Sequence, residues 1–205
     1  MLHWEEDAGD AVSTTIEKNR EDVLNALLAD SRTSVTMKDC EHKHALHFVE
    51  YRISRSASVV QKLVSKGADP IESDCKRQNS LHFASQTGDL NSAVSLLSLG
   101  FEPTLTDNEG LNALHYAAQS TDHETSTILL YTILEKRPSL IASKDNLGRN
   151  ALHQLISTRV TVQIEAIRFL LDKGVNGLAL DISSTSPLAS YLKRYMVQID
   201  FTSAV

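Results

Sequence analysis

The sequence predicts an all-α solenoid, in which similar helix-turn-helix units follow one another and are joined by β-turn or hairpin fingers. Two observations predict it. A short motif recurs at Leu46, Leu81, Leu114, Leu152 and Leu188, with spacings of 35, 33, 38 and 36 residues. Each of these leucines also has an aspartate seven residues before it, and the first four are followed directly by a histidine. Recurrence at such a period is typical of stacked repeats, so we expect five units.

The third unit, residues 107–118, shows why each unit should fold in this way. Asn108-Glu109-Gly110 is a tight-turn sequence, because Gly accepts a positive φ and Asn tolerates one. Asn112 is a good helix N-cap, since its side-chain oxygen can accept a hydrogen bond from a free backbone N–H. The small and apolar residues that follow predict a short, closely packed helix. A turn, a short first helix and a second helix are therefore expected in every unit.

Composition limits the classes of protein to consider. The 205 residues are 41% hydrophobic and 22% charged, which is ordinary for a soluble domain. A net charge of −6 argues against nucleic acid as the main partner. No apolar run reaches the roughly 18 residues that cross a bilayer, and the acidic N-terminal residues are unlike a secretory or transit signal. We expect an intracellular protein, cytoplasmic or nuclear, without membrane insertion.

The two cysteines, Cys40 and Cys75, occupy equivalent positions six residues before their leucines. Equivalent atoms of stacked units should lie roughly 8–10 Å apart. A disulfide tolerates a Cα separation of only about 7 Å. We therefore expect two free thiols, in keeping with a reducing compartment.

Residues 1–37 are expected to form an N-terminal helical cap or degenerate repeat, ahead of a repeat array over residues 38–205. The first ten residues are acidic, and Trp4 is a candidate to dock on the first helix. From about Ser13 to Ala29 the apolar residues fall at helical spacing. Such a cap would shield the first full unit from water with a polar outer face.

Apolar segments predict second helices at residues 59–64, 93–97, 128–134 and 164–171. Gly67, Gly100 and Gly174 should end three of them, because the left-handed conformation after a helix favours Gly. Lys136-Arg137-Pro138 should end the helix of the third unit. The 38-residue spacing there indicates extra residues between Thr121 and Ser143, and insertions in repeat proteins fall in loops, often on a binding face.

The fifth unit starts with Ser186 as an N-cap and Pro187 at the first helical position. Its helix can be extended by Tyr191, Leu192, Tyr195 and Met196. No second helix of comparable length is predicted before Val205. Either the array ends in a shortened cap, or the chain is a fragment whose array continues.

Residues 38–190 resemble the ankyrin repeat, on a period near 33 and on helix starts such as Asn79-Ser80-Leu81-His82. The resemblance implies an ankyrin-repeat solenoid that binds another protein and has no chemistry of its own. The chain departs from the family at His42, Arg77 and Ser184, which stand where Gly110 and Gly148 lie in other units. A non-Gly residue at positive φ costs roughly 1 kcal/mol, so we expect the first, second and fifth turns to differ in shape.

The recurring histidines do not indicate a metal site. His47, His82, His115 and His153 should lie roughly 8–10 Å apart in stacked units, whereas Zn–N bonds are about 2.0–2.1 Å long. The resemblance implies that they are structural hydrogen-bonders that tie neighbouring turns together. The denser group at 42–47 is completed by no cysteine or carboxylate pair of a known metal spacing. No phosphate-binding, zinc-protease or nucleophile-elbow pattern occurs, so we expect no enzyme activity, no cofactor and no metal.

The resemblance also implies that the turn tips and the exposed side of the first helices line a concave groove for the partner. Mapped from each leucine, the candidate partner-binding residues are Glu41, Lys43, Tyr51 and Arg52, then Lys76, Arg77, Gln78 and Gln86, then Asn108, Glu109, Leu111 and Gln119, and finally Asn146, Leu147, Arg149 and Ser157. Basic residues exceed acidic ones in this set, which favours an acidic or mixed-charge peptide partner. Tyr51, Leu111 and Leu147 are the expected apolar anchors.

A second stripe, formed by Phe48, Phe83 and Tyr116, is expected to pack between units, with Gln154 interrupting it. We predict an adaptor, scaffold or targeting module. The alternative is a small-molecule-binding protein or enzyme with a pocket near Tyr51, Phe83 and Tyr116. A third reading is the cytosolic ankyrin region of a channel, receptor or transcription regulator.

Overall fold

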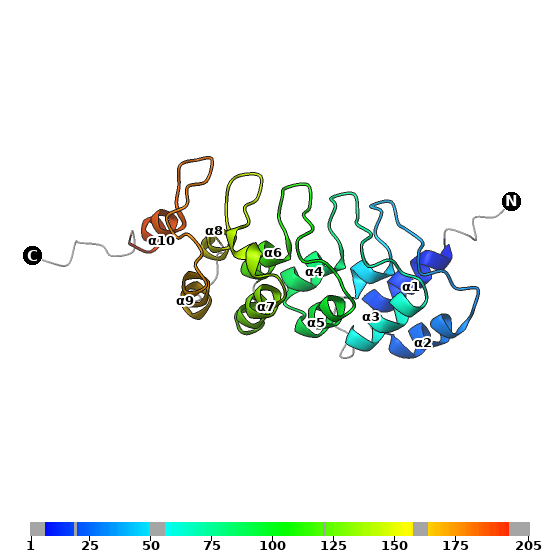
Figure 1. Ribbon diagram of the computed structural model, residues 1–205. Coiled ribbons are helices and arrows are strands. Elements are labelled where there is room, and N and C mark those ends of the chain that lie inside the picture. The colour runs from blue at the N-terminus through cyan, green and yellow to red at the C-terminus, as the bar shows by residue number, and fades with distance from the viewer. Residues whose placement is uncertain (1–6, 19, 50–55, 121, 158–163, 197–205) are drawn as a thin grey trace, which may run out of the picture.

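The computed structural model describes residues 7–18, 20–49, 56–120, 122–157 and 164–196. Within these ranges it contains helices and turns and no strand, which confirms the predicted fold class. Two layers of helices run along the molecule, and a row of narrow loops projects from one edge (Figure 1). We call these loops fingers: finger 1 is residues 39–44, finger 2 is 74–79, finger 3 is 107–112, finger 4 is 145–150 and finger 5 is 181–186.

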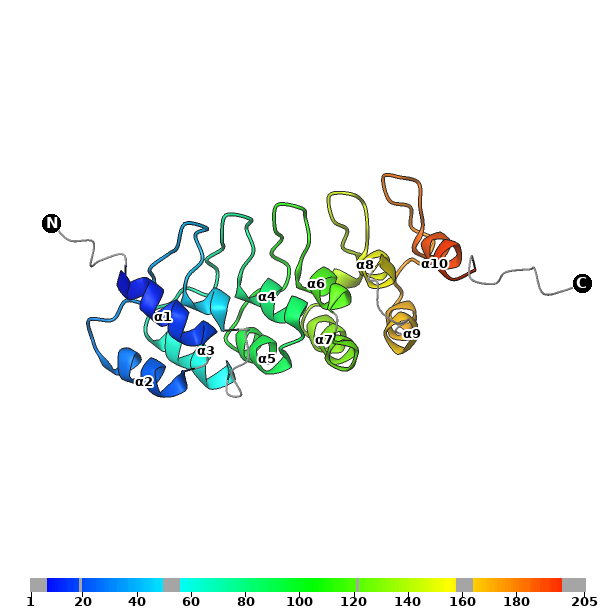
Figure 2. The ribbon, with the colours of Figure 1, turned by 180° about the vertical axis from the view of Figure 1, so that it is seen from behind.

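The inner layer lies next to the fingers and the outer layer lies behind it. The inner layer contains α1 (Asp7–Glu17), a 3-10 helix (Ala45–Phe48), α4 (Ser80–Thr87), α6 (Ala113–Gln119), α8 (Ala151–Ser157) and α10 (Pro187–Met196). The outer layer contains α2 (Glu21–Ala29), α3 (Ser56–Ser65), α5 (Leu90–Ser98), α7 (His123–Lys136) and α9 (Ile164–Asp172). Neighbours pack in chain order within each layer, α4 on α6 and α6 on α8, α5 on α7 and α7 on α9 (Figure 2).

The core is a strip between the two layers, and one apolar cluster continues from Val12 in α1 to Val175 after α9. The motif leucines provide its regular part: Leu46, Leu81, Leu114 and Leu152 are 3% exposed or less. A helix of seven to ten residues is too short to be stable alone, so each unit depends on its neighbours. The long strip of core follows from the repeated sequence.

The predicted second helices are confirmed as α3, α5, α7 and α9. The glycines expected after three of them have φ values of 91 to 97°, and α7 ends at Lys136, before Pro138. One detail differs in the N-terminal region, where α1 ends at Glu17 and α2 begins at Glu21. The helical pattern from Ser13 to Ala29 is therefore a helix pair, shaped like the later units. Its role as a cap, and the boundary at residue 37, stay predictions.

The first and last units differ from the middle ones. In the first unit the inner helix is a 3-10 turn of four residues instead of an α-helix. In the last, α10 runs to Met196, as the apolar residues of that segment predicted. Trp4, and the residues after Met196 that bear on a further helix, lie outside the described ranges.

Candidate functional site: the finger surface

Every finger is built on the aspartate at its first position. The Oδ1 atom of this aspartate accepts hydrogen bonds from the backbone N–H groups two and four residues later, at 2.8–2.9 Å in all five cases of the described chain. The aspartate N–H also donates to the carbonyl oxygen four residues later, at 2.9–3.1 Å. A short carboxylate that closes its own turn in this way is a known property of Asp. This geometry explains why an aspartate precedes each motif leucine.

The fourth residue of each finger has a left-handed backbone whether or not it is glycine. Gly110 and Gly148 have φ values of 80° and 75°, and His42, Arg77 and Ser184 have values of 63°, 62° and 57°. The prediction of three differently shaped turns is therefore wrong. The aspartate holds the turn in one conformation, and its hydrogen bonds keep a non-glycine residue in the unfavourable left-handed region.

Backbone hydrogen bonds tie neighbouring fingers into a row. The N–H of Cys75 donates to the Glu41 oxygen at 2.9 Å, and that of Asn108 to the Lys76 oxygen at 3.0 Å. Equivalent bonds of 2.9 Å join finger 3 to finger 4 and finger 4 to finger 5. The side chains of Asn108 and Asn146 add bonds to the carbonyl oxygens of Cys75 and Asn108, at 3.2 and 3.0 Å. The finger tips therefore form one continuous surface.

The recurring histidines contribute to the structure, as predicted. His47 and His153 place Nε2 at 3.0 and 3.2 Å from a carbonyl oxygen of the next finger, and His82 Nε2 lies 3.0 Å from the Leu105 oxygen, just before finger 3. Their Nδ1 atoms accept from the backbone N–H of the preceding N-cap residue. Burial lowers the pKa of His82, and it lowers the pKa of His115 to about 4. His82 and His115 are therefore neutral structural groups at physiological pH.

Tyr116 and Gln154 occupy equivalent positions and support fingers 3 and 4 from below. The Tyr116 hydroxyl donates to Asp107 Oδ2 at 2.7 Å, and Gln154 Nε2 donates to Asp145 Oδ2 at 2.9 Å. Burial raises the pKa of Tyr116, and its hydrogen bond to Asp107 adds to the effect. Tyr116 is only 3% exposed, so it is a packing residue, as predicted, and does not line the pocket of the alternative reading.

The candidate partner-binding residues fall into three groups. Exposed residues are Glu41, Lys76, Arg77, Gln86, Asn108, Glu109, Asn146, Leu147 and Ser157. Half-buried residues are Lys43, Gln78, Gln119 and Arg149, and Tyr51 and Arg52 lie outside the described ranges. Leu111 requires a correction, because it is only 5% exposed. It closes finger 3 at its base, where the side chain is covered, so it is not an exposed anchor.

Two of the predicted basic residues are already paired. Lys43 Nζ lies 2.6 Å from Glu41 Oε2, and Arg149 Nε lies 2.7 Å from Asp145 Oδ2. The hydrogen bond to Glu41 raises the pKa of Lys43. Within the described residues, Lys76 and Arg77 have no carboxylate at ion-pair distance. The unpaired positive charge is therefore concentrated on finger 2 instead of being spread along the row.

Ile182, at the tip of finger 5, is a further exposed residue that was not among the predicted partner-binding residues. Its side chain is 70% exposed, and Leu147 on finger 4 is 41% exposed. Ile182 stands six residues before Leu188, the same register as Cys75 and Asn108, so the mapping could have found it. The finger surface, defined as the finger tips and the exposed side of the inner helices, thus has a charged region at fingers 1–3 and an apolar region at fingers 4 and 5.

Comparison with known families agrees with this geometry. The family profile described as ankyrin repeats (3 copies) matches residues 81–181. Residues 81–181 are ankyrin repeats. Ankyrin repeats are in general protein-interaction modules, and the fold is typically a non-enzymatic scaffold. No match to a curated protein sequence was found.

Solved structures share the fold of this ankyrin-repeat chain. The crystal structure of EF0377, an ankyrin repeat protein, has 17% sequence identity and a TM-score of 0.74, covering 93% of this chain and 94% of that one. A chain in the structure of Bd0816, a predatory endopeptidase from Bdellovibrio bacteriovorus in complex with immunity protein Bd3460, has 20% identity and a TM-score of 0.73, covering 92% and 93%. None of the helices in the described ranges has the length and apolar character to span a membrane.

Proposed function

We propose that this ankyrin-repeat protein binds another protein through the finger surface, as an adaptor, scaffold or targeting module without catalytic activity. One observation carries the proposal. The fingers share one backbone conformation. The exposed residues at their tips differ from finger to finger and include Lys76, Arg77, Leu147 and Ile182. The fold does not require these side chains, since an aspartate and backbone bonds define the turn. Their chemistry is therefore available for recognition.

The distribution of charge and apolar area defines the partner. A carboxylate of the partner would pair with Lys76 or Arg77, and apolar side chains would cover Leu147 and Ile182. At roughly 8–10 Å per unit, finger 2 lies about 16–20 Å from finger 4. An extended segment of about five or six residues spans this distance, as does a helix of about 11–13 residues. The two free, exposed thiols are in keeping with a reducing compartment, so we place the protein in the cytoplasm or nucleus.

Affinity capture from a cell lysate tests the finger surface. The wild-type chain would be compared with Lys76→Glu/Arg77→Glu and with Leu147→Ser/Ile182→Ser. Lys18→Glu/Arg168→Glu is the matched control, because it reverses two exposed charges away from the fingers. Circular dichroism should show that all four proteins are equally folded.

We expect a protein that is retained by the wild type and the control and is lost from both finger variants. Loss from the charge variant alone would restrict the site to finger 2. Equal retention by all four proteins would refute the finger surface as the binding site.

A further inference from the structure

The insertion in the third unit lengthens α7 and adds a short helix after it. We call the end of α7 and this short helix, up to Ala142, the ledge. Helix α7 has 14 residues, whereas α5 and α9 have nine each, and a 3-10 helix (Pro138–Ala142) follows it. Leu140 is 5% exposed and fixes this short helix to the core. Arg137 forms an ion pair with Glu102 of the preceding unit, with Nη2 and Oε1 2.5 Å apart. The extra residues are therefore held on both sides.

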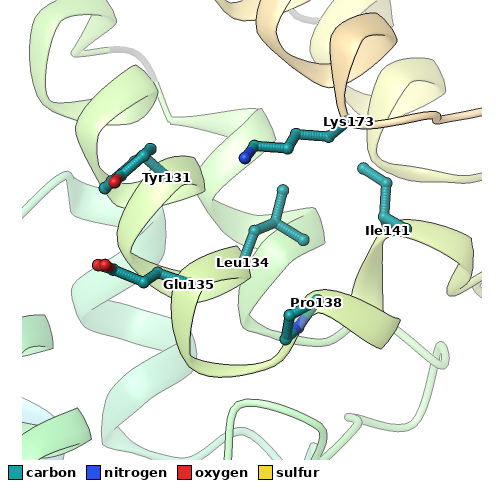
Figure 3. A pocket seen from close by; sticks show the side chains of 6 residues that line it. All are labelled: Tyr131, Leu134, Glu135, Pro138, Ile141 and Lys173. Atoms are coloured by element: carbon teal, nitrogen blue, oxygen red, sulfur yellow. The ribbon is translucent and has the colours of Figure 1, made fainter.

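A small pocket of about 210 Å³ lies between this ledge and the end of α9 (Figure 3). Leu134 and Ile141 form an apolar base, since Leu134 is 4% exposed and Ile141 packs on the core. The remaining lining residues are Tyr131, Glu135, Pro138 and Lys173. Three of the six lie in α7, two in the 3-10 helix after it, and Lys173 directly follows α9, so none belongs to the finger surface.

The rim of the pocket carries a positioned amine without an ionic partner. Lys173 Nζ lies 6.0 Å from the centre of the Tyr131 ring and 5.6 Å from that of Phe169. Such cation–π contacts contribute roughly 0.5–1 kcal/mol at exposed sites and orient the amine. No carboxylate among the described residues is at ion-pair distance from it. Tyr131 is 50% exposed, so its ring is also accessible.

Size and charge select one kind of occupant. Small-molecule sites measure about 300–1,000 Å³, and this pocket is smaller. A pocket of this size with an apolar base suits a single anchoring side chain of a protein partner. The free amine on the rim favours a carboxylate beside that anchor. The Glu135 side chain points away from the Lys173 amine (Figure 3), so it leaves the amine available.

We infer that this pocket is a second docking site, which binds a protein segment carrying an aromatic or branched apolar residue next to an acidic one. Helices α7 and α9, which flank the pocket, belong to the outer layer, and the inner layer separates this layer from the fingers (Figure 1). The pocket would let the protein hold a second partner while the finger surface is occupied. The insertion, which the repeat array does not need for its own packing, would then serve to form this second binding site.

Panning a phage-displayed random 12-residue peptide library against the full chain tests the inference. The selected peptides would be measured against Lys173→Glu, which reverses the charge, and Lys173→Met, which keeps an unbranched side chain and removes the charge. Lys136→Glu is the matched control, because Lys136 is exposed and nearby but does not line the pocket. Lys76→Glu/Arg77→Glu separates this site from the fingers.

We expect a class of peptides with an apolar–acidic pair that binds Lys173→Glu at least tenfold more weakly than the wild type. Lys173→Met should weaken binding by a smaller factor. Lys136→Glu and Lys76→Glu/Arg77→Glu should bind these peptides with wild-type affinity. Failure to enrich such a class would overturn the inference, and so would equal binding to Lys173→Glu. Peptides lost only from the finger variant would support the finger surface and reject the pocket, so the two proposals can fail independently.

Discussion

The finger aspartates show how one side chain can set the shape of a turn. Asp107 is 5% exposed and accepts from two backbone N–H groups and the Tyr116 hydroxyl. Asp39 makes the same two backbone bonds but is exposed. The chemistry of the two residues is equal, and their surroundings differ.

Replacing Asp107 with alanine should therefore destabilise the protein more than the same change at Asp39. Each buried donor that loses its acceptor costs about 1–3 kcal/mol, so we expect a loss of about 3 kcal/mol or more for Asp107→Ala. Asp39→Ala should cost about 1 kcal/mol, because water can replace the carboxylate there. Urea unfolding measures both. Equal losses at the two positions would contradict the role of burial.

Arg77 provides the second prediction at this scale. Its φ of 62° is in the left-handed region, where a β-carbon is unfavourable. Arg77→Gly should raise the free energy of unfolding by up to about 1 kcal/mol, since the glycine relieves this strain although it increases the entropy of the unfolded chain. Thermal unfolding would show it, with Lys76→Gly, which should destabilise, as the control. A lower stability for Arg77→Gly would mean that contacts of the arginine side chain stabilise the protein by more than the positive φ destabilises it.

At the scale of the element, the spacing between fingers is set by close backbone contact. A β-carbon on Gly110 would lie 2.8 Å from the backbone nitrogen of Asn146, which donates the hydrogen bond that joins finger 4 to finger 3. At Gly148 the nearest atom would be Asp181 Cα, at 3.5 Å. Both glycines have positive φ, but only Gly110 needs the absence of a side chain to admit its neighbour.

Gly110→Ala should accordingly cost more than Gly148→Ala. We expect about 1 kcal/mol at Gly148, from the left-handed backbone alone, and about 2–3 kcal/mol at Gly110, from the same strain and a disturbed hydrogen bond. Chemical unfolding of the two variants gives the difference. Hydrogen exchange at the Asn146 amide should increase only in Gly110→Ala, and unchanged exchange there would show that the fingers move apart without cost.

At the scale of the whole molecule, the array accumulates buried neutral histidines along its core. Burial lowers the pKa of His44 and His115 from 6.5 to about 4, and it also lowers those of His47 and His82. The unfolded chain therefore takes up protons at a higher pH than the folded chain does. Stability from this source is complete above the unfolded pKa and is lost as the pH falls toward about 4.

The unfolding temperature should consequently fall between about pH 7 and about pH 4.5. His44 and His115 can each contribute about 3 kcal/mol at full protonation, from shifts of 6.5 to about 4. Thermal scans across this range measure the effect. Repeating them in about 0.5 M salt screens surface charge and should leave most of the slope. A transition temperature that is constant from neutral pH to about pH 5 would contradict the prediction.

The regular features of the fold were predictable because they recur. The period of the motif leucines, the outer helices and the structural role of the histidines all depend on residue types that have the same effect in every unit. Less regular features were not predicted. The break between α1, which ends at Glu17, and α2, which begins at Glu21, interrupts a continuous apolar pattern. Arg77 keeps the left-handed turn although a non-glycine residue disfavours positive φ.

The repeat, the two helical layers and the turn chemistry follow from the sequence alone, because they depend on local periodicity and on a short carboxylate at a fixed position. Which surface residues are available depends on how the units stack. Leu111 is buried, Arg149 is paired with Asp145, Ile182 is exposed and Lys173 lies over Tyr131. Most of these features were not predictable, because burial depends on atoms of neighbouring units, which stacking and not adjacency along the chain brings together.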